Sequence, residues 1–192
     1  MLPRLEGRPL RVEVRASLGP HLAATFIPKR LILLDSEVLA RRGEFERILV
    51  HELFHFSWVR LSNAKRRDWE ILLDAELQRR AKGELGWSAE WRKQKLQPKD
   101  SSERTPAWRR YVCESFCDTA AWLYAGLRSH DEFTLAPRYR NRRRHWFDQT
   151  FLLTNPPAQS RPDGRGSPSL GSRARKGGVK DALSPATLSI PI

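Results

Sequence analysis

The 192-residue sequence lacks any apolar run of the length that a membrane-spanning helix needs, about 20 residues. Its longest apolar stretches, residues 30–35 and 47–59, are short or interrupted by ionisable side chains. The N-terminal residues MLPRLEGRPLRVEV also lack the apolar core of a signal peptide. These absences predict a cytoplasmic protein that does not associate with membranes.

Cysteine is scarce, with two residues in the whole chain. Cys113 and Cys117 are four positions apart in a segment with a helical pattern, where neighbours on one face have poor geometry for a disulfide. A disulfide scaffold is therefore excluded. We interpret the two cysteines as buried thiols in a reducing compartment, in preference to a redox or metal-binding pair.

Acidic residues are fewer than basic ones, with 22 Asp and Glu against 35 Lys and Arg and a formal net charge of +13. Two segments carry most of the excess. Residues 155–192 hold six basic and two acidic residues, and five arginines cluster just before them: Arg138, Arg140, Arg142, Arg143 and Arg144. The rest of the chain carries only +4, so the charge does not by itself indicate a nucleic-acid-binding surface.

The C-terminal 38 residues have few large apolar side chains but contain six Pro, five Gly and six Ser. Such a composition does not offset the entropy lost on folding, so residues 155–192 are predicted to be a disordered basic tail. Residues 1–154 are sufficient for one domain with a hydrophobic core. No internal repeat is present.

The pattern of apolar residues predicts an α+β domain with a small N-terminal sheet. Two β-like runs, residues 10–18 and 24–34, flank a Gly-Pro turn signal. Helices are expected over residues 43–61, 65–85 and 108–127, with a last helix that holds the arginine cluster and extends to Leu153. The polar segment 86–107 is predicted to be a surface loop, with a lid over a cleft as the alternative. Because apolar residues cover most of the circumference of helix 43–61, we place it at the domain centre.

This central helix contains the sequence His51-Glu52-Leu53-Phe54-His55, an H-E-x-x-H pattern. With 3.6 residues per turn, the two imidazoles lie one turn apart on one face, a separation suited to binding one tetrahedral zinc ion. Glu52 lies to the side of this face, where it can act as a general base on water. Two core histidines could produce the pattern by chance, but three ionisable groups in an otherwise apolar helix would be costly without a metal.

A catalytic zinc ion usually has three protein ligands, so a third ligand is required. The extended pattern H-E-x-x-H-x-x-G-x-x-H fails, because Trp58 and Leu61 occupy its last two positions. Glu114 and Asp118 are the only acidic residues of helix 108–127 and share one face of it. We predict Glu114 as the third ligand, and Asp118 as the acceptor of a hydrogen bond from a ligand imidazole.

Glu70 and Asp74 form a second pair of acidic residues four positions apart, closer to the H-E-x-x-H motif in the sequence. Basic residues surround this pair, so no metal is needed to explain it. We therefore favour Glu114 over Glu70 as the ligand.

The motif HELFH, followed on a later helix by ESFCD, resembles the gluzincin metallopeptidases, which carry H-E-x-x-H and a downstream Glu-x-x-x-Asp. The resemblance implies a compact zincin-like fold and a single Zn²⁺, and it favours His51 as the imidazole bound by Asp118. It implies hydrolysis of a peptide bond in protein or peptide substrates, with Glu52 activating water and then passing the proton to the leaving amine.

Gluzincins often stabilise the oxyanion with a Tyr or His, for which this sequence offers Tyr111, His130 and His145. At 192 residues, the sequence is expected to lack the second domain of larger gluzincins, which forms one wall of their cleft.

Two other functions remain open at the level of the sequence. The arginines of 138–144 and the basic tail could bind nucleic acid weakly and nonspecifically, as in a DNA-associated protease similar to the SprT-like group. That group uses a histidine as its third ligand, and none is suitably placed here; a solvated helical face is the simpler interpretation of the arginines. The third function is a zinc-stabilised domain without catalysis, which would need a fourth protein ligand.

Overall fold

The computed structural model describes Leu5 and residues 7–151, so the predicted tail, 155–192, lies outside the described residues. No helix in the described part is both long and apolar enough to cross a membrane. The fold is α+β, as predicted. Its elements in chain order are β1 (Arg11–Arg15), β2 (Ala23–Phe26), a 3-10 helix (Ile27–Lys29), β3 (Leu31–Asp35), α1 (Ser36–Ala40), α2 (Glu44–Trp58), α3 (Asn63–Gln78), α4 (Trp87–Lys93), α5 (Asp100–Glu103), α6 (Pro106–Tyr124) and α7 (Pro137–Phe151).

The sheet has three strands in the order β1-β3-β2, with β3 parallel to β1 and antiparallel to β2. The predicted second run, residues 24–34, is therefore two strands and not one. Pro28 lies in the 3-10 helix between them, and Arg30 has a left-handed backbone with φ of 49°. Because proline has no N–H to donate to a ladder, the run turns back there and leaves β2 at the edge of the sheet.

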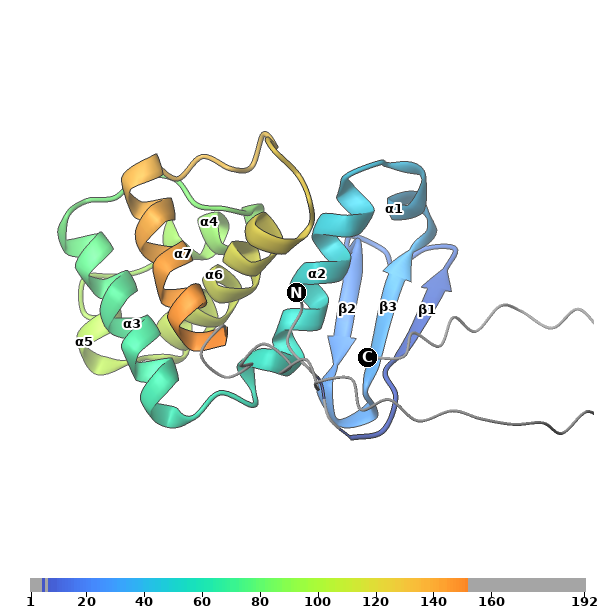
Figure 1. Ribbon diagram of the computed structural model, residues 1–192, viewed down its shortest axis with the longest axis horizontal. Coiled ribbons are helices and arrows are strands. Elements are labelled where there is room, and N and C mark those ends of the chain that lie inside the picture. The colour runs from blue at the N-terminus through green and yellow to red at the C-terminus, as the bar shows by residue number, and fades with distance from the viewer. Residues whose placement is uncertain (1–4, 6, 152–192) are drawn as a thin grey trace, which may run out of the picture.

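Helix α2 lies between the sheet and the other long helices (Figure 1). Ile48 and Phe56 belong to a core formed with the sheet, which includes Ile32 of β3. Phe54 belongs to a second core, where its ring centroid lies 5.8 Å from that of Phe116 on α6. Burial against both layers explains why apolar residues surround this helix, and it confirms its central position.

The second core joins α2, α3, α6 and α7 around large aromatic side chains such as Trp69, Phe116 and Phe147. Helix α6 begins with Thr105 as its N-cap, whose hydroxyl accepts a hydrogen bond from Trp108 N–H, and with a proline in the first turn. Helix α6 packs against α2 along its length. The two helices that carry the H-E-x-x-H motif and the downstream acidic pair are thus direct neighbours.

The prediction of a loop over residues 86–107 is wrong, because this segment contains α4 and α5. Helix α4 has only seven residues, too few for a clear periodic pattern, and it is held by contacts with α6. The preceding helix, α3, ends at Gln78 instead of Leu85, and Arg80 has a left-handed backbone with φ of 53°. Residues 79–86 are therefore not helical, and Glu84 and Gly86 of this segment are buried.

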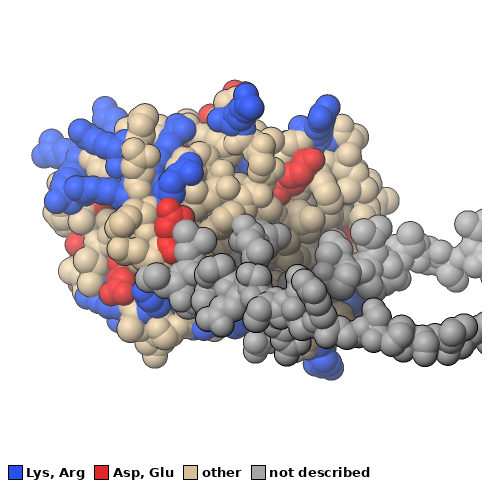
Figure 2. Space-filling view, viewed as in Figure 1, with Lys and Arg blue, Asp and Glu red and all other residues tan. Residues whose placement is uncertain are grey.

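The arginine cluster is not uniformly solvated, because Arg143 is fully buried. Its guanidinium donates to Glu76 Oε2 and to Glu84 Oε2, each at 2.6 Å. Arg138, Arg142 and Arg144 are exposed. Figure 2 shows Lys and Arg side chains gathered over the helical end of the molecule. Arg143 therefore stabilises the core and is not available to a phosphate group.

Candidate functional site

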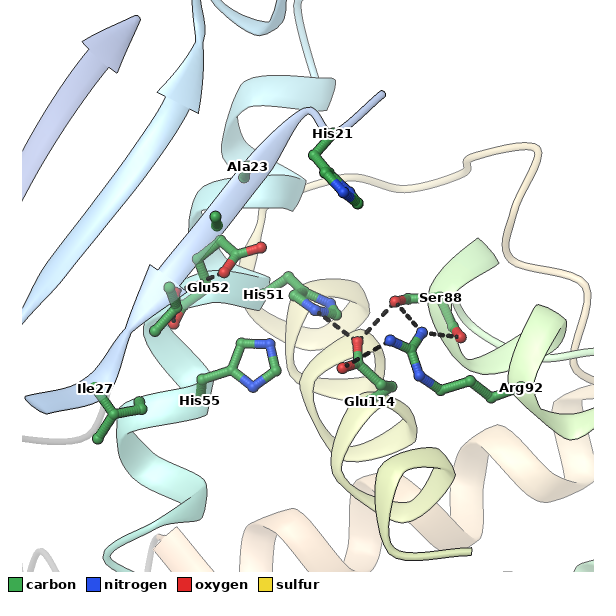
Figure 3. A pocket seen from close by; sticks show the side chains of 11 residues that line it. His21, Ala23, Ile27, His51, Glu52, His55, Ser88, Arg92 and Glu114 are labelled. Atoms are coloured by element: carbon green, nitrogen blue, oxygen red, sulfur yellow. Dashed lines mark hydrogen bonds and ion pairs between the residues drawn. The ribbon is translucent and has the colours of Figure 1, made fainter. Parts of the chain in front are cut away.

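His51 and His55 lie one turn apart on α2, with their ring centroids 5.0 Å from one another. Both side chains, together with Glu52, line a pocket of about 350 Å³ between the sheet and helices α4 and α6 (Figure 3). The other side chains that shape this pocket include His21, Ala23, Thr25, Ser88, Arg92 and Glu114. The predicted histidines and general base therefore face a common space.

Glu114 reaches this pocket from α6, and its Oε2 lies 3.3 Å from Nε2 of His51. Burial opposes ionisation of this carboxyl group, but the hydrogen bond from His51 and the charges of His51 and His55 lower its pKa to about 2. Two interactions come from α4. The Ser88 hydroxyl donates to Oε2 at 2.7 Å, and the Arg92 guanidinium lies 3.4 Å from Oε1. Glu114 is thus held as a carboxylate beside the imidazoles.

Asp118, one turn after Glu114, lies 2.7 Å from Nδ1 of His51 and is 1% exposed. The structure therefore brings together the two residues that the resemblance to gluzincins paired. Burial opposes protonation of His51, but the carboxylates of Asp118 and Glu114 outweigh it and raise the pKa of His51 well above its usual value. Since Nδ1 faces Asp118, Nε2 is the nitrogen of His51 that is directed at Glu114 and the pocket.

The carboxylate of Asp118 also accepts a hydrogen bond from Ala89 N–H in the first turn of α4, at 2.9 Å. A side chain at Gly86, the residue before this helix, would overlap that carboxylate. Glycine is therefore required at Gly86 by close packing and not by its backbone, which is extended with φ of −176°. Asp118 links His51 to α4, the helix that supplies Ser88 and Arg92.

Glu52 is nearly buried, and its Oε2 accepts a hydrogen bond of 2.6 Å from the hydroxyl of Thr25 on β2. The same hydroxyl lies 3.3 Å from the backbone carbonyl of Glu52. Glu52 lines the pocket but is not bound to an arginine or lysine in the described residues. A carboxylate that is oriented by a neutral hydroxyl remains able to accept a proton.

Cys117 offers a different donor beside the two histidines. Its Sγ and one nitrogen each of His51 and His55 lie within 4.8 Å of one another. Both cysteines are free thiols, but Cys113 is only half-buried and not buried as predicted, and its Sγ lies 3.5 Å from Nδ1 of His55. Cys117 is fully buried and does not line the pocket, whereas Glu114 does. An ion bound through Cys117 would lie deeper than one bound through Glu114.

The second acidic pair, Glu70 and Asp74, lies on α3. Glu70 is buried on α3, where its carboxylate accepts hydrogen bonds from Arg67 at 2.9 Å and Arg104 at 2.8 Å. Neither Glu70 nor Asp74 lines the pocket of the two histidines. The basic neighbours of Glu70 therefore account for it, as the sequence indicated.

None of the three oxyanion candidates lines the pocket. The Tyr111 hydroxyl is buried and donates to Glu84 at 2.6 Å, and Nε2 of His130 lies 2.6 Å from Glu44. His145 is exposed and contacts Gln149. Besides His51 and His55, two side chains that can carry a positive charge line this pocket, His21 and Arg92.

Sequence reasoning missed five residues that shape the site: His21, Thr25, Gly86, Ser88 and Arg92. They lie outside the motifs, on β2, before it, or in the segment that was predicted to be a loop. Gly86 beside a tryptophan is the one local signal that could have suggested a helix start there. No periodic pattern marks the others, because each reaches the site through tertiary packing.

A second pocket of about 350 Å³ adjoins the first and shares His21, Ala23, His51, Glu52 and Ser88 with it. The two pockets therefore adjoin along these side chains, and we treat them as two parts of one cleft. Its second part has apolar walls from Leu22, Ile48 and Trp87. His51 and Glu52 of the H-E-x-x-H motif thus line both parts of this cleft.

Comparison of the chain with models of known protein families, with curated proteins and with solved structures finds no match.

Proposed function

We propose that the protein is a zinc metallopeptidase that holds one Zn²⁺ through Nε2 of His51, Nε2 of His55 and the carboxylate of Glu114. The observation that carries this proposal is the shared pocket: all three groups line it beside Glu52. Nδ1 of each imidazole is engaged, by Asp118 and by the thiol of Cys113. Nε2 of each ring is therefore left to bind a metal ion. Zinc-binding histidines commonly have this arrangement, with one ring nitrogen on the metal and the other in a hydrogen bond.

The charges of the site fit a divalent cation. Three carboxyl groups surround the two imidazoles, those of Glu52, Glu114 and Asp118. Each of these acidic residues is at most 14% exposed to solvent. Groups of this kind are costly to bury unless they are paired or coordinate a metal. Zinc would supply Lewis acidity that lowers the pKa of a water molecule and polarises a carbonyl group.

The residues of the chain have separate roles in this proposal. Glu52, oriented by the Thr25 hydroxyl at 2.6 Å, accepts a proton from the attacking water and passes it to the leaving amine. Asp118 holds the His51 ring in one tautomer and fixes its direction. Ser88 and Arg92 orient Glu114 from α4.

A peptide substrate is supported by the position of β2. This strand lies at the edge of the sheet, paired only with β3, and three of its residues line the pocket: Ala23, Ala24 and Thr25. An edge strand offers unpaired backbone groups to which an extended peptide can add. The second part of the cleft extends from His51 to Ala23 and to residues 20–22 before β2, so a chain added to this edge would pass the proposed metal site.

We expect purified protein to contain one zinc ion per chain by elemental mass spectrometry, and Glu114→Gln to lose it. Glu70→Gln is the matched control, because Glu70 is likewise a buried carboxylate in contact with arginine side chains. It should keep the zinc. Absence of metal from the wild type, or equal loss in both variants, would contradict the proposed ligand set.

The same measurement on Cys117→Ala separates an open site from a closed one. A closed four-ligand site, with Cys117 added to the other donors, would be structural and not catalytic. We expect Cys117→Ala to retain its zinc, because Cys117 does not line the pocket. Loss of zinc in this variant would favour the zinc-stabilised domain without catalysis.

Gly86→Ala is expected to lower zinc affinity by about tenfold, because the added methyl group displaces the Asp118 carboxylate from His51. The overlap should also destabilise the fold by about 1–3 kcal/mol. Competition with a chromophoric chelator measures the first effect and urea unfolding the second. Gly19→Ala is the control, since its added methyl meets no atom within 4 Å and strains only the backbone. Unchanged zinc affinity in Gly86→Ala would show that Asp118 does not orient a ligand.

A further inference from the structure

A separate pocket of about 600 Å³ lies at the C-terminal end of α2. It is lined by Trp58, the last residue of α2, and by side chains from α3, the loop before α6, and α6 itself. None of its lining residues belongs to the cleft that contains His51, His55 and Glu52. It is therefore a second site on the molecule and goes beyond the proposed function.

Glu70 is the one acidic residue that lines this pocket. Four arginines line it as well: Arg66, Arg67, Arg104 and Arg109. The Glu70 carboxylate accepts from Arg67 through one oxygen and from Arg104 through the other, at 2.9 and 2.8 Å. Both of its oxygens are thus already engaged. The pocket retains an excess of three positive charges when all five side chains are ionised.

Arg66 and Arg109 have no carboxylate partner among the described residues. Arg66 donates to the carbonyl oxygen of Val59 at 3.0 Å, and its guanidinium lies 5.8 Å from the centre of the Trp58 ring. Its Nε is buried and has no hydrogen-bond partner in the described part of the chain. Because this Nε is closed off from solvent, an anion in the pocket would bind the other N–H groups of Arg66, which is only half-buried.

The first turn of α3 adds to the positive potential, because Asn63, Arg66 and Arg67 of this helix line the pocket. Helix N-termini carry a partial positive charge that favours anions. Guanidinium groups match phosphate oxygens in a bidentate way and remain charged at all relevant pH values. Glu70 neutralises only part of the charge of the four guanidinium groups, so a multivalent anion in the concavity would reduce their remaining repulsion.

We infer that this arginine pocket binds a small, multiply charged phosphate compound, either inorganic polyphosphate or the phosphate chain of a nucleotide. The concave shape and the volume of about 600 Å³ suit a small molecule. A nucleic-acid strand would instead need a basic surface that extends along several phosphates. The exposed arginines Arg138, Arg142 and Arg144 of α7 do not line this pocket.

Isothermal titration of the full chain with sodium triphosphate tests this inference, with Arg109→Ala as the variant. Arg109 is exposed and has no side-chain interaction in the described residues, so the variant should fold normally. Arg110→Ala is the matched control, because Arg110 is the next residue of α6, is equally exposed and does not line the pocket. We expect one saturable site per chain, weakened at least about tenfold in Arg109→Ala and unchanged in Arg110→Ala.

Further arms identify the phosphate source and exclude general charge effects. Tighter binding of adenosine triphosphate than of triphosphate would identify a nucleotide, and equal binding would identify polyphosphate; both must depend on Arg109. Sulfate at equal ionic strength should not compete. The inference is overturned if triphosphate binding is not saturable, if both variants weaken it equally, or if only a single-stranded oligonucleotide binds through Arg109. Removal of zinc by triphosphate would be the same in both variants and so cannot imitate the expected difference.

Discussion

Glu52→Gln is expected to keep one zinc ion per chain while it lowers peptide hydrolysis by about 10² to 10⁴-fold, the usual contribution of general acid–base catalysis. Glutamine has the size of glutamate and can still accept the hydrogen bond from Thr25, so the geometry of the pocket should persist. It cannot accept a proton from water. The effect should therefore appear in kcat and not in the metal content.

The measurement begins with a peptide library incubated with the wild type and analysed by mass spectrometry for cleaved products. The best substrate then gives kcat/KM for the wild type, Glu52→Gln and the control Glu103→Gln, an exposed glutamate on α5. We expect the control to match the wild type. Equal rates in wild type and Glu52→Gln would exclude Glu52 as the base, and a zinc-loaded wild type without any hydrolysis would refute the peptidase while leaving the metal site intact.

Arg143→Met is expected to destabilise the fold by about 3–5 kcal/mol, because it leaves the buried carboxylate of Glu76 without its cation and that of Glu84 with Lys93 alone, whose Nζ lies 3.1 Å away. Arg143 is fully buried and contacts Glu76 at 2.6 Å and Glu84 at 2.6 Å. Burial opposes ionisation of Glu84, yet the charge of Arg143 outweighs it and lowers the pKa of Glu84 to about 2. Urea unfolding followed by circular dichroism measures the change.

Arg142→Met is the matched control, since Arg142 is the preceding residue of α7 and its side chain is exposed. A change within about 0.5 kcal/mol is expected there. If Arg143→Met does not fold, Arg143→Lys keeps the charge but loses the planar fork that reaches both carboxylates, and it should be intermediate in stability. Equal stabilities of the Arg142 and Arg143 variants would show that the buried ion pairs do not hold the helices together.

Local periodicity was sufficient for the parts of the site that lie on single helices. The spacing of His51 and His55 places both imidazoles on one face of α2, and the spacing of Glu114 and Asp118 does the same on α6. The apolar circumference of α2 indicated a central helix, which the structure confirms. Because burial of ionisable groups is costly, the acidic pair of an apolar helix could be matched with the histidines before their contact was known.

Periodicity failed where an element is short or where a side chain acts through distant neighbours. Helix α4 has seven residues and was predicted to be a loop, so Ser88 and Arg92 were not expected at Glu114. Arg143 was assigned to a solvated face because its neighbours in sequence are arginines. Its partner Glu84 lies 59 residues away, at the end of the helix predicted over residues 65–85.

The sequence by itself therefore determined the α+β class, the central helix, and the two pairs of residues, His51 with His55 and Glu114 with Asp118, from which we propose a zinc site. These properties depend on side-chain type and on the 3.6-residue repeat, which are local. Only the tertiary structure decided which carboxylate meets which imidazole, that β2 borders the cleft, and that four arginines surround a second pocket. Those relations arise from the packing of α2, α4 and α6 and of the sheet edge, since contacts between residues far apart in the chain are set by the shape of the whole core.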